Sequence, residues 1–102
     1  FACTDSEPFM ERLSGLERRT VILAGMETHV CVWQTARDLR ERGYAVHVVA
    51  DAVLSRTAEN RGIGLDLMRA AGCVITSSEV VAFDLVGGAG HPAFKAVSKL
   101  VR

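Results

Sequence analysis

Short apolar runs alternate with amphipathic segments along this chain. The apolar runs cover residues 21–24, 45–50 and 73–75, and they predict three buried strands. The segments between them carry apolar residues at every third or fourth position, as helices with one buried face do. Strands that alternate with helices in this way form a parallel sheet, so the predicted fold is α/β, with three layers and helices on the faces of the sheet.

Two of the predicted helices are long. We expect them over about residues 29–42 and 57–71, and we expect shorter helices that include residues 9–16, 81–85 and 92–101. The residues at core spacing in the two long helices are Val32, Ala36, Leu39, Ile63, Leu67 and Ala70. Gly43 is predicted to end the first of them in a left-handed conformation that returns Tyr44 against Leu39.

Capping residues mark the predicted starts of three other helices. Thr4 and Glu7 have the spacing of a capping box, and so do Thr76 and Glu79. Pro92 suits the first position of the last helix, where its missing N–H costs nothing.

Charge and composition exclude several classes of function. The 102 residues include 12 basic and 12 acidic side chains, so no net field attracts nucleic acid or an anionic membrane. No apolar run approaches the length of a bilayer span. A hydrophobic content of 49% is enough for the core of a single domain. We therefore expect no nucleic-acid partner and no membrane partner.

The cysteines point to a reducing compartment. Cys3, Cys31 and Cys73 are odd in number and far apart in the sequence, which favours free thiols in the cytoplasm over a disulfide framework. The chain has no CxxC pair, and no second histidine or carboxylate stands at metal-ligand spacing beside His47. We expect no metal and no cofactor.

Candidate chemistry is concentrated where the first strand leads into a helix. Cys31 lies in the first turn of that helix, where the dipole and the free N–H groups favour a thiolate. A thiolate that attacks a carbonyl carbon also needs a base and hydrogen-bond donors for the developing oxyanion. The alternative is that Cys31 is an inert small hydrophobe, which is the commoner role of a lone helical cysteine. We expect Cys73 to lie in the core.

Other polar or aromatic residues have two interpretations each. His29 either lines a pocket or faces solvent at the start of its helix, and His47 is either an edge histidine or a satisfied core histidine. Asp51 and Arg56 follow a strand's carboxyl end, where structural and functional roles are equally favoured. Trp33 contacts either the core or a neighbouring subunit, and a substrate contact is the less favoured alternative.

The chain resembles a known family at several of these positions. Residues 25–32, followed by 35–39 and 43–46, look like the nucleophile region of the isochorismatase-like cysteine hydrolases. Residues 48–52 and 55–56 look like the family's next strand and loop. Residues 76–79 and 91–95 narrow the resemblance to the branch called isochorismatase-domain-containing proteins. The resemblance covers nearly the whole chain.

The resemblance implies a site and a Rossmann-like topology. Cys31 corresponds to the nucleophile, and the backbone N–H groups of Glu27 and Cys31 correspond to the oxyanion hole. A cis peptide is implied between Met26 and Glu27. The family's triad also contains an aspartate and a lysine, which have no counterpart here. We therefore expect residues 1–102 to be the C-terminal part of a single isochorismatase-like domain, inactive by itself.

The function implied is hydrolysis of a small amide, or of a related small molecule, through a covalent thioester-type intermediate on Cys31. The expected partners are a small-molecule substrate and other copies of the chain in a homo-oligomer. An alternative from another class is a non-catalytic interaction or assembly module of the same fold. A dinucleotide-binding domain is a weaker alternative, because residues 25–30 lack the second and third glycines of GxGxxG.

Overall fold

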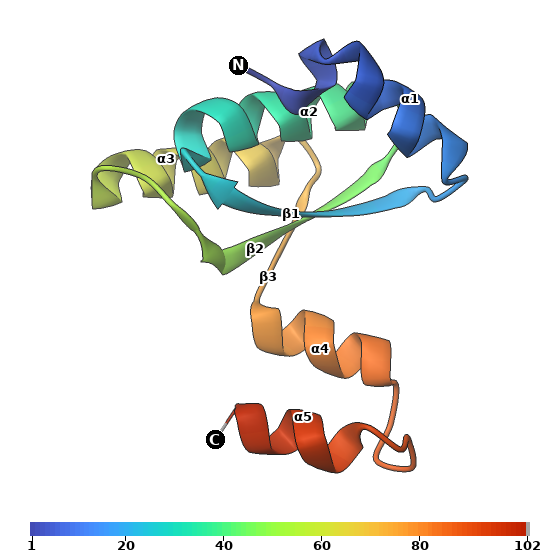
Figure 1. Cartoon of the computed structure of the whole chain (residues 1–102). Helices are drawn as coiled ribbons and strands as arrows, with labels where there is room; N and C mark the ends of the chain where they lie inside the picture. Colours follow the sequence, from blue (N-terminus) through green and yellow to red (C-terminus); the bar gives the residue numbers. More distant parts are fainter. Residues whose placement is uncertain (102) are drawn as a thin grey trace.

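A parallel three-stranded sheet forms the centre of the structure, a computed structural model that describes residues 1–101. The strands are β1 (Thr20–Met26), β2 (Ala45–Leu54) and β3 (Val74–Thr76), in the order β1-β2-β3 (Figure 1). The predicted α/β class and the three predicted strands are confirmed.

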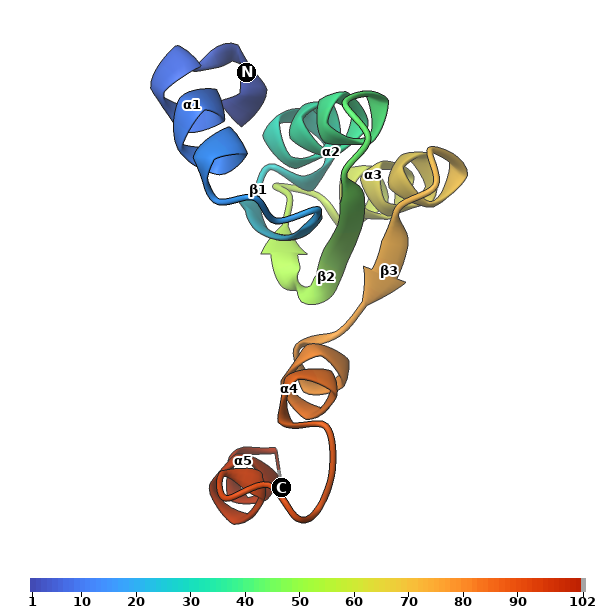
Figure 2. The ribbon, with the colours of Figure 1, turned by 90° about the vertical axis from the view of Figure 1, so that its right-hand side faces the viewer.

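Five helices surround the sheet unevenly. They are α1 (Glu7–Gly15), α2 (Trp33–Glu41), α3 (Ala58–Ala70), α4 (Ser78–Val86) and α5 (Phe94–Leu100), with a short 3-10 turn η1 (Cys3–Asp5) and a wide π-helical turn η2 (Thr28–Val32). Helices α1, α2 and α3 lie on one side of the sheet, whereas α4 and α5 extend away on the other (Figures 1 and 2). None of the helices within residues 1–101 is long and apolar enough to span a bilayer.

The core lies between the sheet and helices α2 and α3. Its buried residues are Val32, Ala36, Leu39, Tyr44, Val46, Val48, Val53, Met68 and Cys73. The predicted inward face of α2 and the predicted burial of Cys73 are confirmed. The predicted inward face of α3 is wrong: Ile63 and Leu67 are 47% and 40% exposed, and Gly64 and Met68 are buried instead.

Gly64 explains the orientation of α3. A Cβ atom at this position would lie 2.9 Å from the Thr28 carbonyl oxygen and 3.0 Å from the His29 Cα and N atoms. Such distances are too short for a side chain, so the backbone of α3 packs directly against η2. The helix is therefore turned toward its glycine rather than toward its larger apolar residues.

The helix ends show one confirmed prediction. Gly43 has a φ of +89°, the Gly43 N–H donates to the Arg40 carbonyl and the Tyr44 N–H donates to the Leu39 carbonyl at 3.0 Å. This is the expected Schellman ending, and Tyr44 is buried behind it.

Both capping boxes are wrong, because a serine caps each helix. The Ser6 hydroxyl accepts from the Phe9 N–H at the start of α1, and the Ser77 hydroxyl accepts from Val80 at the start of α4. Thr4 donates its hydroxyl to the Asp38 carboxylate at 2.8 Å, and Thr76 is the last residue of β3. Pro92 also lies outside its helix, since α5 begins at Phe94.

Strand β2 is longer than predicted and contains a bulge. Leu23 pairs with Val48, and Gly25, two residues later, pairs with Val53, five residues later. Residues 51–54, expected to be loop, therefore belong to the strand. Arg61 of α3 stabilises the bulge, because its guanidinium donates to the carbonyls of Ala50 and Val53.

Replacing Gly64 with alanine should destabilise the protein by about 1–3 kcal/mol, the usual cost of overpacking a tight contact. Thermal unfolding monitored by circular dichroism would measure this loss. Gly62→Ala is the matched control, because it lies in the same helix with no atom within 4 Å of its added Cβ. The control should be neutral or stabilising by up to about 1 kcal/mol, since alanine favours helix over glycine. Equal melting temperatures for the two variants would contradict the close contact.

The 102-residue polypeptide should self-associate, because β1 is an unpaired edge strand and Ile22 on it is 47% exposed. Gel filtration with light scattering would show species larger than a monomer. Ile22→Lys should shift the distribution toward monomer, since a charge on an edge strand opposes pairing. Leu100→Lys on α5 is the control for a general gain in solubility. A monodisperse wild-type monomer would contradict this prediction.

Candidate functional site

The site is formed where strands β1 and β2 end side by side. Met26, the last residue of β1, pairs with Leu54, the last residue of β2. The turn that follows β1 leads into η2, and the loop that follows β2 leads into α3. In an open parallel sheet, the crevice outside the carboxyl ends of the strands is where ligands usually bind.

Backbone hydrogen bonds close the turn after β1. The peptide bond between Met26 and Glu27 is cis, at the position that the resemblance implies. The Glu27 carbonyl accepts hydrogen bonds from the N–H groups of Val30 and Val32, both at 3.1 Å. These bonds close the wide turn η2, in which Cys31 lies half-buried.

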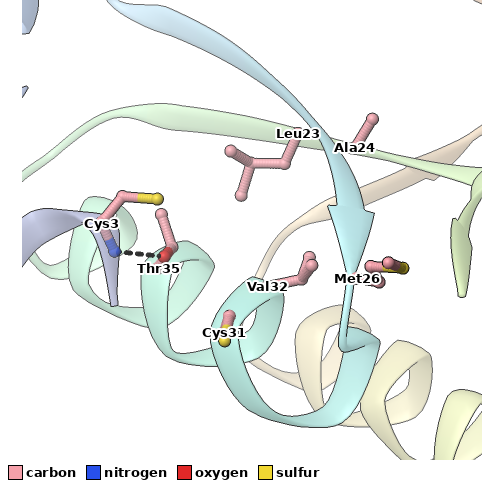
Figure 3. A pocket seen from close by; sticks show the side chains of 7 residues that line it. All are labelled: Cys3, Leu23, Ala24, Met26, Cys31, Val32 and Thr35. Atoms are coloured by element: carbon pink, nitrogen blue, oxygen red, sulfur yellow. Dashed lines mark hydrogen bonds between the residues drawn. The ribbon is translucent and has the colours of Figure 1, made fainter. Parts of the chain in front are cut away.

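Cys31 lines a small, mostly apolar pocket (Figure 3). The pocket has a volume of about 90 Å³, and its lining residues are Cys3, Leu23, Ala24, Met26, Cys31, Val32 and Thr35. The Cys3 N–H donates to the Thr35 hydroxyl at 2.9 Å, which attaches the start of the chain to α2. Cys3 and Cys31 therefore share one cavity, as Figure 3 shows.

Glu27 and Arg56 form an ion pair across the two strand ends. The Arg56 Nε donates to the Glu27 carboxylate at 3.2 Å. His29 Nε2 lies 3.9 Å from the same carboxylate, and His29 Nδ1 hydrogen bonds with the Ser55 hydroxyl at 3.0 Å. His29 is thus held by the loop after β2, which neither of its two interpretations anticipated.

Thr28 supplies a contact that the sequence pattern did not reveal. Its hydroxyl donates to the Leu54 carbonyl at 2.8 Å, and its side chain is completely buried. The only sequence signal for this contact was that both residues follow predicted parallel strands.

The remaining candidate residues lie outside the pocket. His47 is half-buried on the central strand, between Ile22 and Val74 of its neighbours. Trp33 packs against the core, with the Arg37 guanidinium 5.6 Å from its ring centre. Cys73 is buried, and this burial raises the pKa of its thiol.

Asp51 has a structural role in this arrangement. Its carboxylate accepts from the Ser78 N–H at 2.8 Å and from the Ser78 hydroxyl at 3.1 Å. The backbone hydrogen bond is the main reason why the pKa of Asp51 lies below its ordinary value, and the hydroxyl adds to it. Asp51 thereby attaches the start of α4 to the bulge in β2.

Within residues 1–101, no three histidine, cysteine, aspartate or glutamate side chains are grouped so that they could hold a metal ion. The chemistry that the described residues offer is that of a thiol beside a tightly folded turn.

The isochorismatase domain matches residues 1–80 of the chain. The chain belongs to the isochorismatase family.

Two curated relatives show how much of the family's length is present. The secreted isochorismatase effector Isc1 of Phytophthora sojae is 51% identical over 84% of this chain and 41% of its own length. Isochorismatase domain-containing protein 1 of Salmo salar is 42% identical over 96% of this chain and 34% of its own. The chain thus spans between 34% and 41% of the length of these relatives.

Solved structures of related proteins share the fold. The MAR1 ribonuclease of Caenorhabditis elegans is 45% identical, with a TM-score of 0.88 over 98% of this chain and 50% of its own. A pyrazinamidase/nicotinamidase of Streptococcus mutans is 37% identical, with a TM-score of 0.60 over 65% of this chain and 37% of its own.

Two YcaC structures are also similar. The Pseudomonas aeruginosa protein, solved with hexane-2,5-diol and covalent acrylamide, is 26% identical, with a TM-score of 0.82 over 96% of this chain and 54% of its own. The Escherichia coli protein, an octameric hydrolase of unknown specificity, is 31% identical, with a TM-score of 0.76 over 78% of this chain and 39% of its own.

The stabilisation from Asp51 should be lost in acid. A carboxylate with a lowered pKa stabilises the folded state above its unfolded pKa of about 3.9, and the contribution disappears as the pH falls through the lower folded value. The Asp51→Asn variant should therefore have a lower melting temperature than the wild type at neutral pH. The difference between the two melting temperatures should narrow from about pH 4 downward. Ser78→Ala should show only part of this gap, because the backbone donor remains. A gap for Asp51→Asn that is constant from pH 7 to pH 2 would contradict the assignment.

Proposed function

We propose that this isochorismatase-family chain carries the nucleophile of a hydrolase that acts on a small amide or a related small molecule. The observation on which this proposal rests is the position of Cys31. It lies in the first turn after the carboxyl end of β1, half-buried, at the wall of a pocket. A partly accessible thiol at such a position is what nucleophilic catalysis requires.

In the proposed reaction, the Cys31 sulfur attacks the amide carbonyl carbon and forms a tetrahedral oxyanion. The backbone N–H groups of Glu27 and Cys31 are the proposed donors to this oxyanion. The C–N bond then breaks, the amine leaves with a proton, and an acyl thioester remains on Cys31. Water hydrolyses the thioester, which releases the carboxylic acid and restores the thiol.

Proton transfer in this scheme needs a base, and no residue that lines the pocket is a carboxylate or a histidine. By the family resemblance, an aspartate would accept the thiol proton and a lysine would stabilise the thiolate. Both would come from residues outside this sequence. General-base catalysis contributes about 10²–10⁴-fold, so the 102 residues alone should turn over amides very slowly.

Two similar proteins support this chemistry. The Pseudomonas aeruginosa YcaC structure holds covalent acrylamide, a small electrophile, which supports a reactive nucleophile in a protein of this fold. The pyrazinamidase/nicotinamidase is named for amide hydrolysis. An octameric relative also supports the proposal of a homo-oligomer.

RNA cleavage is the alternative that the name of the Caenorhabditis elegans neighbour raises. The chain has equal numbers of acidic and basic residues, so no net field would collect a polyanion. The second alternative is a non-catalytic module of the same fold. An amide-hydrolysis screen and an RNA-cleavage assay on the same preparation would separate the three functions.

The proposed cellular location depends on whether the cysteines are free or paired in disulfides. Cys3, Cys31 and Cys73 are all free, which favours a reducing compartment such as the cytoplasm. Secretion is the alternative location, because the Phytophthora sojae relative is named as a secreted effector.

Cys31 should be alkylated by iodoacetamide well before Cys73 at pH 6. Cys73 is only 6% exposed, and burial raises the pKa of its thiol, so it contributes little thiolate near neutral pH. Peptide mass spectrometry over a time course would measure the rates at both sites. Similar rates across the pH range would show that Cys31 is an ordinary thiol.

Cys31→Ala should abolish amide hydrolysis by the complete enzyme. The matched control is Cys3→Ser, because Cys3 lines the same pocket without a part in the proposed reaction. This control should retain most of the activity, because it exchanges one atom of the pocket wall and leaves the proposed nucleophile in place. Hydrolysis that persists in a folded Cys31→Ala protein would disprove the proposed nucleophile.

A further inference from the structure

Three consecutive residues of the turn after β1 bond to three consecutive residues at the end of β2. The turn contributes residues 27–29, and the end of β2 with its loop contributes residues 54–56. The contacts are Arg56 to Glu27 at 3.2 Å, Thr28 to Leu54 at 2.8 Å, and His29 to Ser55 at 3.0 Å. We call this set the turn clamp.

The contacts of the clamp differ in burial. Thr28 is fully buried, and its backbone also packs against Gly64, so this residue belongs to the core of the fold. The Arg56 side chain is 86% exposed and that of Glu27 is 27% exposed. An ion pair this exposed contributes little to stability. The ion pair instead restricts the orientation of Glu27, the residue at the start of the turn.

His29 is restricted in a similar way. Its side chain is 17% exposed, with one ring nitrogen bonded to Ser55 and the other 3.9 Å from the Glu27 carboxylate. The side chains on both sides of Thr28 are thus held from the loop after β2. The backbone between Glu27 and His29 has little freedom to turn.

We propose that Ser55 and Arg56 are positioning residues, which hold the turn so that the Glu27 N–H keeps its place relative to Cys31. The inference rests on the proposed function, because it assigns a purpose to the amides of Glu27 and Cys31. Neither Ser55 nor Arg56 lines the pocket, so both act through the turn rather than on the substrate.

Two reactions of Cys31 distinguish this role from a structural one. In acylation by p-nitrophenyl acetate, the sulfur bonds to the carbonyl carbon, an oxyanion forms, and p-nitrophenolate leaves as the C–O bond breaks. In alkylation by iodoacetamide, the sulfur bonds to the methylene carbon as iodide leaves, and no oxyanion forms. A displaced Glu27 N–H slows the first reaction and has no part in the second.

The test measures the acylation rate and the alkylation rate of Cys31 by peptide mass spectrometry in the full chain. Thermal unfolding of each variant checks that it is folded. Arg56→Met and Ser55→Ala should each slow acylation about tenfold, since misplacement by about 1 Å can cost up to 10²-fold. Alkylation should change by less than about twofold, as it needs no oxyanion donor. Ser55→Thr, which keeps the hydroxyl, should restore most of the acylation rate.

Arg69→Met is the matched control, because it removes another exposed arginine–carboxylate ion pair, with Asp66 at 3.0 Å on α3. Both of its rates should equal those of the wild type. Unchanged acylation in Arg56→Met and Ser55→Ala would overturn the inference and leave the proposed function intact. Parallel loss of both reactions with a lower melting temperature would also overturn it, as the clamp would then be only structural. A wild-type Cys31 whose ratio of acylation to alkylation is no higher than that of glutathione would instead disprove the proposed oxyanion site itself, and the inference with it.

Discussion

The parallel pairing of β1 with β2 is the constraint on which the rest of this structure depends. The two strands end opposite each other at Met26 and Leu54, so the segments that follow them meet at one edge of the sheet. Parallel strands have their carboxyl ends at the same edge, and this is where the crevice of an open α/β sheet lies. The turn that contains Cys31 and the loop that contains Arg56 are therefore neighbours, although their contacts span 26 to 29 residues of sequence.

This pairing requires a bulge in β2, and the bulge has consequences of its own. Residues 49–52 have no partner on β1. At this bulge the Arg61 guanidinium donates to the carbonyls of Ala50 and Val53, and Asp51 lies beside the first residue of α4. A bulge commonly redirects side chains next to a functional site. In this chain the bulge attaches α3 and α4, which lie on opposite sides of the sheet, to β2.

The candidate site combines closely packed elements with the thiol of Cys31. Gly64 lets α3 contact the turn directly, the Glu27 carbonyl closes the turn, and Cys31 faces the pocket that results. Functional groups held by such packed elements keep their geometry better than groups on free loops. The family match covers residues 1–80, which include Cys31 and the turn before it.

The sequence by itself determined the features that depend on neighbouring residues. The apolar runs located the starts of the three strands within one residue, the periodicity of α2 identified its buried face, and Gly43 marked its end. The strand-to-helix order also placed Cys31 correctly in a first helical turn. These are local properties, because burial and glycine conformation act over a few residues.

The tertiary structure decided what depends on distant partners. Thr4 and Thr76 each begin a capping-box sequence, but the Thr4 hydroxyl donates to Asp38 and Thr76 belongs to β3. Ser6 and Ser77 cap the two helices instead. The face of α3 follows from a backbone contact at Gly64, and the turn clamp follows from the β1–β2 register. Register and close packing arise only when segments far apart in the sequence meet, so no pattern within a single segment contains them.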